Sequence, residues 1–104
     1  MQRVAFKMKL LPGKREEYIK RHCQIWPELT DLLISYGISD YSIFLDEETN
    51  TLFGVQKTKK SEGSQDLGNT EIVKKWWSYM ADIMETNSDN SPVTIPLEEV
   101  FHME

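Results

Sequence analysis

The hydrophobic period of the chain changes abruptly at Pro12-Gly13. From Val4 to Leu10 every second residue is large and apolar, which is the period of a β-strand with one buried face. From Lys14 to Trp26 the apolar residues recur at helical spacing. Because Pro27 has no backbone donor and restricts the residue before it, we expect a kink or a restart at this point, followed by more helix up to Gly37.

Two extended runs follow, residues 41–45 and 51–58, with a short polar turn between them. They predict a β-hairpin in which Tyr41 shares a face with the apolar residues of its strand. The next stretch, residues 61–68, is polar and has no periodicity. It indicates a loop or a short frayed helix.

A second helix is predicted to start at a cap on Asn69 or Thr70 and to end before the turn-rich residues 87–92. Residues 97–103 can supply a final strand. The order is therefore β-α-β-β-α-β, and the fold class is α+β. This is the ferredoxin-like arrangement, a four-stranded antiparallel sheet with both helices on one face. The whole chain, 1–104, forms one domain.

The second face of such a sheet would have no helix to cover it. The apolar residues of the predicted strands do not all fall on one face, as three of them show: Ala5, Phe44 and Phe53. The second face is therefore not wholly polar. A second subunit could cover it. We therefore expect a homodimer.

Charge and composition exclude several kinds of partner. A formal charge of -5 repels a polyanion, so we expect no nucleic acid. No apolar run approaches the roughly 20 residues that span a bilayer, so we expect no membrane segment. The single cysteine, Cys23, has no internal partner, and no signal-peptide pattern is visible. We place the protein in the cytoplasm.

The motifs of metal and cofactor sites are also missing. His22 and His102 lie far apart, and Cys23 beside the first does not give a zinc-site spacing. The sequence contains no dinucleotide fingerprint, no P-loop and no Gly-x-Ser-x-Gly motif. We expect no metal and no cofactor, which leaves cofactor-free chemistry or binding.

Tyr18 and His22 are the first candidates for such chemistry, because residues four apart share one helix face. Histidine exchanges protons near neutral pH, and a phenol can orient a substrate oxygen. An ordinary half-buried helix face explains the same spacing. Trp76 and Trp77 point about 100° apart, so one ring meets something besides the core, either a neutral polyhydroxyl ligand or a dimer interface. Tyr41 alone is consistent with a tyrosine at the core edge.

Several segments, taken together and in order, resemble the L-rhamnose mutarotase family, and they span nearly the whole chain. They are Glu17-Tyr18-Ile19-Lys20-Arg21-His22, Ile25-Trp26-Pro27-Glu28-Leu29, Tyr41-Ser42-Ile43-Phe44-Leu45-Asp46, Trp76-Trp77-Ser78-Tyr79-Met80 and Asp89-Asn90-Ser91-Pro92-Val93.

The resemblance implies a dimeric ferredoxin-like domain of the α/β-barrel type and an isomerase that interconverts the α and β anomers of L-rhamnose, a neutral sugar, without a cofactor. By position, His22 would be the proton donor of ring opening, and the sugar contacts would be Tyr18, Tyr41, Trp76 and Trp77. Two other readings fit the same fold: a cofactor-independent monooxygenase with an apolar pocket, and a sugar-binding dimer without catalysis.

Overall fold

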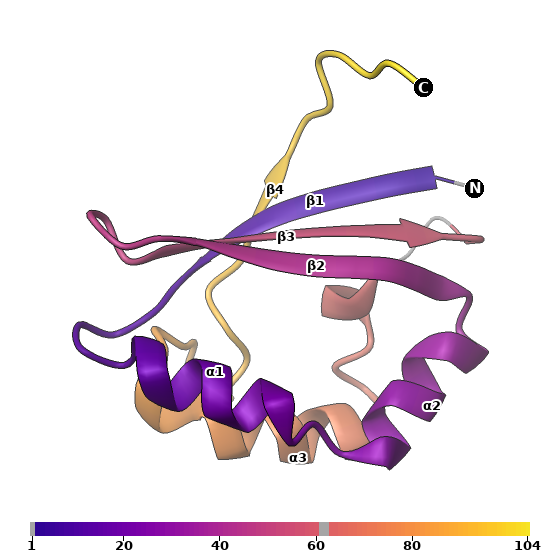
Figure 1. The fold of residues 1–104 in the computed structure, drawn as a ribbon. Helices are drawn as coiled ribbons and strands as arrows, with labels where there is room; N and C mark the ends of the chain where they lie inside the picture. Colours follow the sequence, from indigo (N-terminus) through magenta and orange to yellow (C-terminus); the bar gives the residue numbers. More distant parts are fainter. Residues whose placement is uncertain (1, 61–62) are drawn as a thin grey trace.

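A computed structural model of the chain describes residues 2–60 and 63–104, and its elements follow the predicted order (Figure 1). The strands are β1 (Gln2–Lys9), β2 (Ile38–Asp46), β3 (Thr51–Thr58) and β4 (Ile95–Leu97). The helices are α1 (Arg15–Cys23), α2 (Pro27–Ser35) and α3 (Glu71–Met80), with short 3₁₀ turns η1 (Ser64–Asp66) and η2 (Ala81–Ile83).

The four strands form one antiparallel sheet in the order β2-β3-β1-β4. The predicted hairpin is confirmed as β2 and β3, and β1 lies between β3 and the short β4. All three α-helices lie on the same side of the sheet (Figure 1). This is the topology of the ferredoxin-like fold, as the sequence predicted.

The first predicted helix is divided in two at Pro27. Trp26 has the extended backbone that a residue before proline prefers, and Pro27 occupies the first turn of α2, where no backbone donor is needed. α2 ends at Ser35, and Gly37 follows the C-cap residue Tyr36 with a φ of +82°, in the left-handed region. A Cβ at Gly37 would also lie 2.9 Å from the Cβ of Lys59. Glycine is therefore required there.

A β-bulge in β2 lies between Ile38 and the inward-facing Tyr41, which keeps the parity of Ile43 and Leu45. Ser39 pairs with Lys57 and Ser42 pairs with Val55, so β2 carries one extra residue between these two pairs. The extra residue changes the alternation of the strand. As a result Ile38 is buried in the core and Tyr41, three residues later, also faces the helices.

The structure corrects the position of the last strand. We predicted residues 97–103, but β4 is limited to Ile95–Leu97, which pairs with Ala5 to Lys7 of β1. Residues 98–104 extend away from the body of the molecule (Figure 1) and are exposed. β1 continues to Gln2, and Arg3 Nε still donates to Glu99 Oε1 at 2.8 Å, but the backbone after Leu97 no longer pairs with β1.

The core fills the space between the helices and the inner face of the sheet. Its buried members include Phe6 and Met8 of β1, Leu52 of β3, and Val73 and Trp76 of α3. Side chains from the strands and from α3 thus pack in the same hydrophobic cluster.

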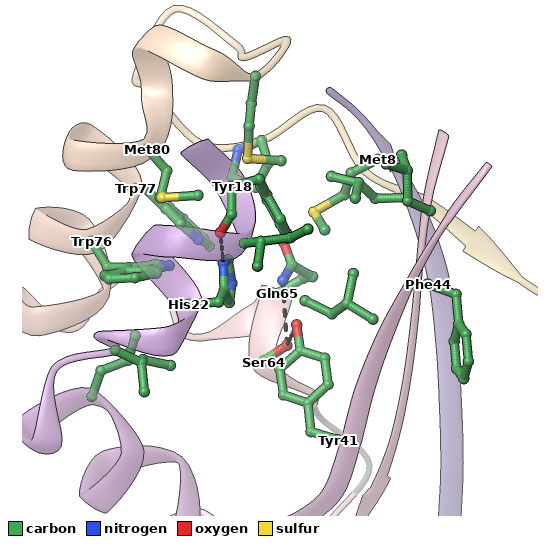
Figure 2. Close-up of a pocket in the computed structure, with 18 of the residues that line it drawn as sticks. Met8, Tyr18, His22, Tyr41, Phe44, Ser64, Gln65, Trp76, Trp77 and Met80 are labelled. Atoms are coloured by element: carbon green, nitrogen blue, oxygen red, sulfur yellow. Dashed lines mark hydrogen bonds between the residues drawn. The ribbon is translucent and has the colours of Figure 1, made fainter. Parts of the chain in front are cut away.

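In the described part of the chain no helix covers the opposite face of the sheet (Figure 1), and apolar side chains cross it together with polar ones. Two rows of paired residues cross it, Phe44-Phe53-Lys7-Ile95 and Ser42-Val55-Ala5-Leu97. Phe44 is 64% exposed, and its ring lies on the far side of β2 from the helices (Figure 2). The prediction from the sequence that this face is not wholly polar is confirmed.

Candidate active site

A cavity of about 690 Å³ opens between α1, α3 and the inner face of the sheet. Its size is within the range of small-molecule sites. Most of its walls are apolar or aromatic, and polar groups enter from α1, β2 and η1 (Figure 2). Arg15 and Glu47, joined by an ion pair of 3.2 Å between Nε and Oε1, also line it.

His22 lies against Tyr18, one turn earlier on α1. The two rings stack with their centroids 4.3 Å apart. His22 Nδ1 is 3.1 Å from the backbone oxygen of Tyr18. A carbonyl oxygen only accepts, so Nδ1 carries the hydrogen and Nε2 is the ring nitrogen left for other partners. Burial lowers the pKa of His22, which favours the neutral ring at pH 7.

Trp76 closes the other side of His22. The edge of one ring meets the face of the other with centroids 5.4 Å apart. Trp76 is only 8% exposed and also packs against Trp26 at 5.1 Å. This is the core position that the sequence predicted for one of the paired tryptophans, and it lines the cavity at the same time.

Trp77 lies between the main cavity and a smaller polar pocket of about 360 Å³. The six-membered ring of its indole packs closely against Gly68, where a Cβ would lie 2.6 Å from a ring carbon. The smaller pocket is lined by amide and hydroxyl groups, among them Gln65 and Thr94. Gly68 therefore allows the indole to stand at this boundary.

Arg21 holds the helix that carries His22 against the end of α3. Its Nη1 donates to Asp82 Oδ1 and to the Tyr79 backbone oxygen, both at 2.8 Å, and its Nε donates to Glu17 at 2.8 Å. The guanidinium also lies over the Tyr79 ring, 4.6 Å from its centroid. Tyr79 in turn stacks on Trp26. The ion pair of Arg21 with Glu17, one turn earlier on α1, is thus part of a larger network.

Tyr41 enters the cavity from β2 and meets the polar residues of η1. Its hydroxyl lies 3.5 Å from Ser64 Oγ, and Gln65 is the next residue. Behind them is Gln56 of β3, which is 0% exposed and makes two hydrogen bonds to Ser64. Burial raises the pKa of Tyr41, and hydrogen bonds from Ser64 and Gln65 oppose that rise.

The comparisons with known proteins agree with one another over the full length of the chain. The family model described as L-rhamnose mutarotase matches residues 3–103. The L-rhamnose mutarotase of Bacteroides thetaiotaomicron is 68% identical over 104 residues, which cover all of both chains. The L-rhamnose mutarotase of Formosa agariphila is 65% identical, again with full coverage of both chains.

A crystal structure of the L-rhamnose mutarotase from Formosa agariphila matches the present structure with a TM-score of 0.91. The alignment has 60% identity and covers 100% of each chain. The chain belongs to the L-rhamnose mutarotase family. The resemblance that the sequence motifs indicated is thus confirmed.

The residues that the resemblance with the L-rhamnose mutarotase family singled out come together in the structure. They all line the main cavity, although α1, β2 and α3 supply them: Tyr18, His22, Tyr41, Trp76 and Trp77. His102 lies in the exposed C-terminal segment. In the described ranges, 2–60 and 63–104, no group of three or more metal-ligating side chains is found, and no helix is long and apolar enough to cross a membrane.

Sequence reasoning missed the polar wall of this mutarotase-family cavity. Ser64 and Gln65 lie in the stretch for which only a loop or short helix was predicted, and the 3₁₀ turn η1 brings them to Tyr41. A signal was available in β3. Gln56 shares its parity with the buried Leu52, and a polar side chain on the buried face of a strand needs a partner.

Proposed function

We propose that this chain catalyses the interconversion of the α and β anomers of L-rhamnose by opening and reclosing the sugar ring. As a member of the L-rhamnose mutarotase family, it is an isomerase that acts on carbohydrates. The observation that carries the proposal is the position of His22, whose ring is held between Tyr18 and Trp76 at the wall of an apolar cavity.

The cavity has the chemistry that a neutral sugar needs. Indole and phenol rings cover the C–H faces of a pyranose, and their N–H and O–H groups bind its hydroxyls. We assign this binding role to Tyr18, Tyr41, Trp76 and Trp77. The substrate carries no charge, so the net charge of -5 does not oppose its binding.

His22 is proposed as the residue that exchanges protons with the anomeric oxygen. The sequence interpretation made it the proton donor of ring opening. The hydrogen bond from Nδ1 to Tyr18 and the lowered pKa support a different order. In the neutral ring Nε2 first accepts the proton of the anomeric hydroxyl, and the resulting imidazolium donates it back when the ring recloses on the other face of the aldehyde.

A second copy of the chain is the proposed partner. The bare sheet face carries Phe44, Ile95 and Leu97, all of them exposed, and the segment after β4 exposes Val100 and Phe101. Contiguous apolar surface of this kind is typical of an interface between subunits. Cys23 is the only cysteine and is exposed, so it forms no bond within the chain, which supports a cytoplasmic location.

Saturation-transfer NMR on the two anomeric protons tests the proposed activity. With L-rhamnose at equilibrium, the protein should transfer saturation between the α and β signals far faster than buffer does. Other 6-deoxy sugars measured in the same way define the specificity. If calorimetry detects binding while exchange stays at the background rate, the chain is a sugar-binding protein. Consumption of O₂ with an activated aromatic substrate would favour the monooxygenase reading.

A further inference from the structure

The buried amide of Gln56 has one orientation. Its Oε1 accepts the backbone N–H of Ser64 at 2.7 Å, and its Nε2 lies 2.9 Å from Ser64 Oγ. Since a backbone N–H only donates, the oxygen and nitrogen of this amide cannot be exchanged. Gln56 therefore donates to the Ser64 hydroxyl.

The Ser64 hydroxyl receives a second donor. Gln65 Nε2 donates to Ser64 Oγ at 3.3 Å. The Oε1 of the same amide lies 3.2 Å from Thr94 Oγ1, whose single hydrogen it shares with the Pro92 backbone oxygen at 3.0 Å. A hydroxyl has two acceptor sites and one hydrogen. With both acceptor sites of Ser64 occupied, its hydrogen is directed to Tyr41 Oη, which is 3.5 Å away.

This direction of hydrogen bonding determines what Tyr41 offers to the cavity. Its oxygen accepts from Ser64, so its own O–H hydrogen is left to donate to another partner. Tyr41 and His22 both line the cavity, one from β2 and the other from α1 (Figure 2). One wall thus presents a donor, Tyr41 O–H, and another presents an acceptor, His22 Nε2.

Tyr18 is the competing phenol in this cavity. Burial raises the pKa of Tyr18 far above its usual value, and the nearby Tyr41 raises it further. Among the residues that the structure describes, none forms a hydrogen bond to the Tyr18 hydroxyl. Burial raises the pKa of Tyr41 as well, but hydrogen bonds from Ser64 and Gln65 stabilise its phenolate form and oppose that rise. Of the two phenols, Tyr41 is the one equipped to release a proton.

We propose that Tyr41 is the acid that protonates the ring oxygen during ring opening, and that Ser64 and Gln65 are positioning residues that direct its O–H hydrogen into the cavity. This inference rests on the proposed mutarotase activity. It assigns Tyr41 a catalytic step in addition to sugar contact.

The protons and electrons of the proposed step balance. His22 Nε2 takes the proton of the anomeric hydroxyl, and C1=O1 forms as the C1–O5 bond breaks. The bond's electron pair goes to O5, which takes the Tyr41 proton and leaves a phenolate. After rotation of the aldehyde, O5 attacks its other face, Tyr41 recovers its proton from O5, and His22 returns its proton to O1. The enzyme ends in its starting state.

Tyr41→Phe is the first test, with NMR exchange as the readout. Removing the acid should lower kcat for anomer exchange by about 10² to 10⁴, while the affinity for L-rhamnose in calorimetry changes only a few-fold. Tyr36→Phe is the matched control, since Tyr36 lies at the end of α2 and does not line the cavity. Tyr18→Phe should raise KM more than it lowers kcat.

Ser64→Ala is the second test and keeps the phenol in place. It should lower kcat about 3- to 10-fold with little change in KM, because it removes the group that directs the Tyr41 hydrogen. Ser35→Ala removes an exposed serine hydroxyl that does not line the cavity, and it should change neither constant. A purely structural role for Ser64 would lower the melting temperature and leave kcat of the folded fraction unchanged.

The outcomes separate this inference from the activity on which it rests. If the unmodified protein exchanges anomers only at the background rate, the proposed function itself fails. If that protein is active and folded Tyr41→Phe keeps near-full kcat, Tyr41 is a sugar contact only. A large loss of kcat in Tyr18→Phe, with Tyr41→Phe active, would transfer the acid role to Tyr18. Other titratable side chains line the cavity and stay unchanged in every variant: Arg15, His22, Cys23 and Glu47.

Discussion

The imidazole of His22 stacks on the ring of Tyr18 at 4.3 Å and is bound through Nδ1 to the backbone oxygen of the same residue at 3.1 Å. One residue thus fixes both the plane and the tautomer of the histidine. The hydrogen bond comes from the backbone, so it would survive a change of the Tyr18 side chain. The backbone of α1 therefore determines the direction in which Nε2 points.

His22→Asn should reduce anomer exchange by about 10² to 10⁴, because asparagine keeps polarity and approximate size but does not titrate. Sugar affinity, measured by calorimetry, should stay within a few-fold. His102→Asn is the control, since His102 lies in the exposed C-terminal segment. Loss of exchange in His102→Asn with a near-normal His22→Asn would move the proton transfer to the other histidine.

The pH dependence of exchange should follow the lowered pKa of His22. Above that pKa the ring is neutral and Nε2 accepts a proton; as the pH falls through it, Nε2 becomes protonated and the base is lost. Exchange above background should therefore decline toward acid pH, with a midpoint below the usual value of about 6.5. His22→Asn should lack this decline. A rate that rises as the pH falls would mean that the resting histidine acts as the acid.

The folding stability should also fall toward acid pH because of His22. The unfolded state binds a proton to His22 at a higher pH than the folded state does, so stability is lost as the pH falls below about 6.5 and toward the folded pKa. Below the folded pKa the loss levels off. Thermal melts of the unmodified protein and His22→Asn at several pH values measure the difference, and parallel curves would contradict the burial of this histidine.

L-Rhamnose should change the tryptophan emission in a saturable way, because Trp76 and Trp77 line the cavity and Trp26 packs against Trp76. Trp77→Phe should weaken the response. Gly68→Ala should displace the Trp77 indole, since the added Cβ would lie 2.6 Å from the ring. An unchanged spectrum at saturating sugar, with binding seen by calorimetry, would limit the two residues to core or interface packing.

Arg21→Lys should lower the melting temperature although the charge is kept. Lysine cannot donate to Asp82 through two nitrogens, as Arg21 does at 2.8 and 3.2 Å, and it cannot lie flat on Tyr79. A domain of this size loses roughly 4 °C or more for each kcal/mol. Lys20→Arg, next to it on the exposed side of α1, is the control. Equal melting temperatures for Arg21→Lys and the unmodified protein would show that the network adds nothing to stability.

Phe44→Asp should weaken the proposed dimer, because it places a charge in the apolar row across the bare sheet face. A stable interface buries roughly 1,200 to 2,000 Å² in total. Light scattering at a protein concentration of tens of micromolar should give twice the chain mass for the unmodified protein. It should give a lower mass for the variant. A monomer mass for the unmodified protein would remove the homodimer from the proposal.

The sequence by itself determined the order of the elements, the break at Pro27 and the inward face of each strand, because periodicity and proline act over a few residues. The order of its motifs also indicated the L-rhamnose mutarotase family. It did not determine the last strand. Whether residues 97–103 pair depends on what lies beside them, and the structure confines pairing in the single chain to Ile95–Leu97.

Only the tertiary structure decided how the site is assembled. Tyr41 faces the cavity with the parity of Ile43 and Leu45, as the sequence predicted, but the sequence shows no feature that would locate the bulge opposite Gln56, which brings Ile38 to the same face. Ser64 and Gln65 meet Tyr41 through a 3₁₀ turn that periodicity cannot detect. These contacts join residues 8 or more positions apart, as from Gln56 to Ser64, so they exist only once the sheet has paired. Local propensity sets the elements, and the long-range register sets which side chains face one another.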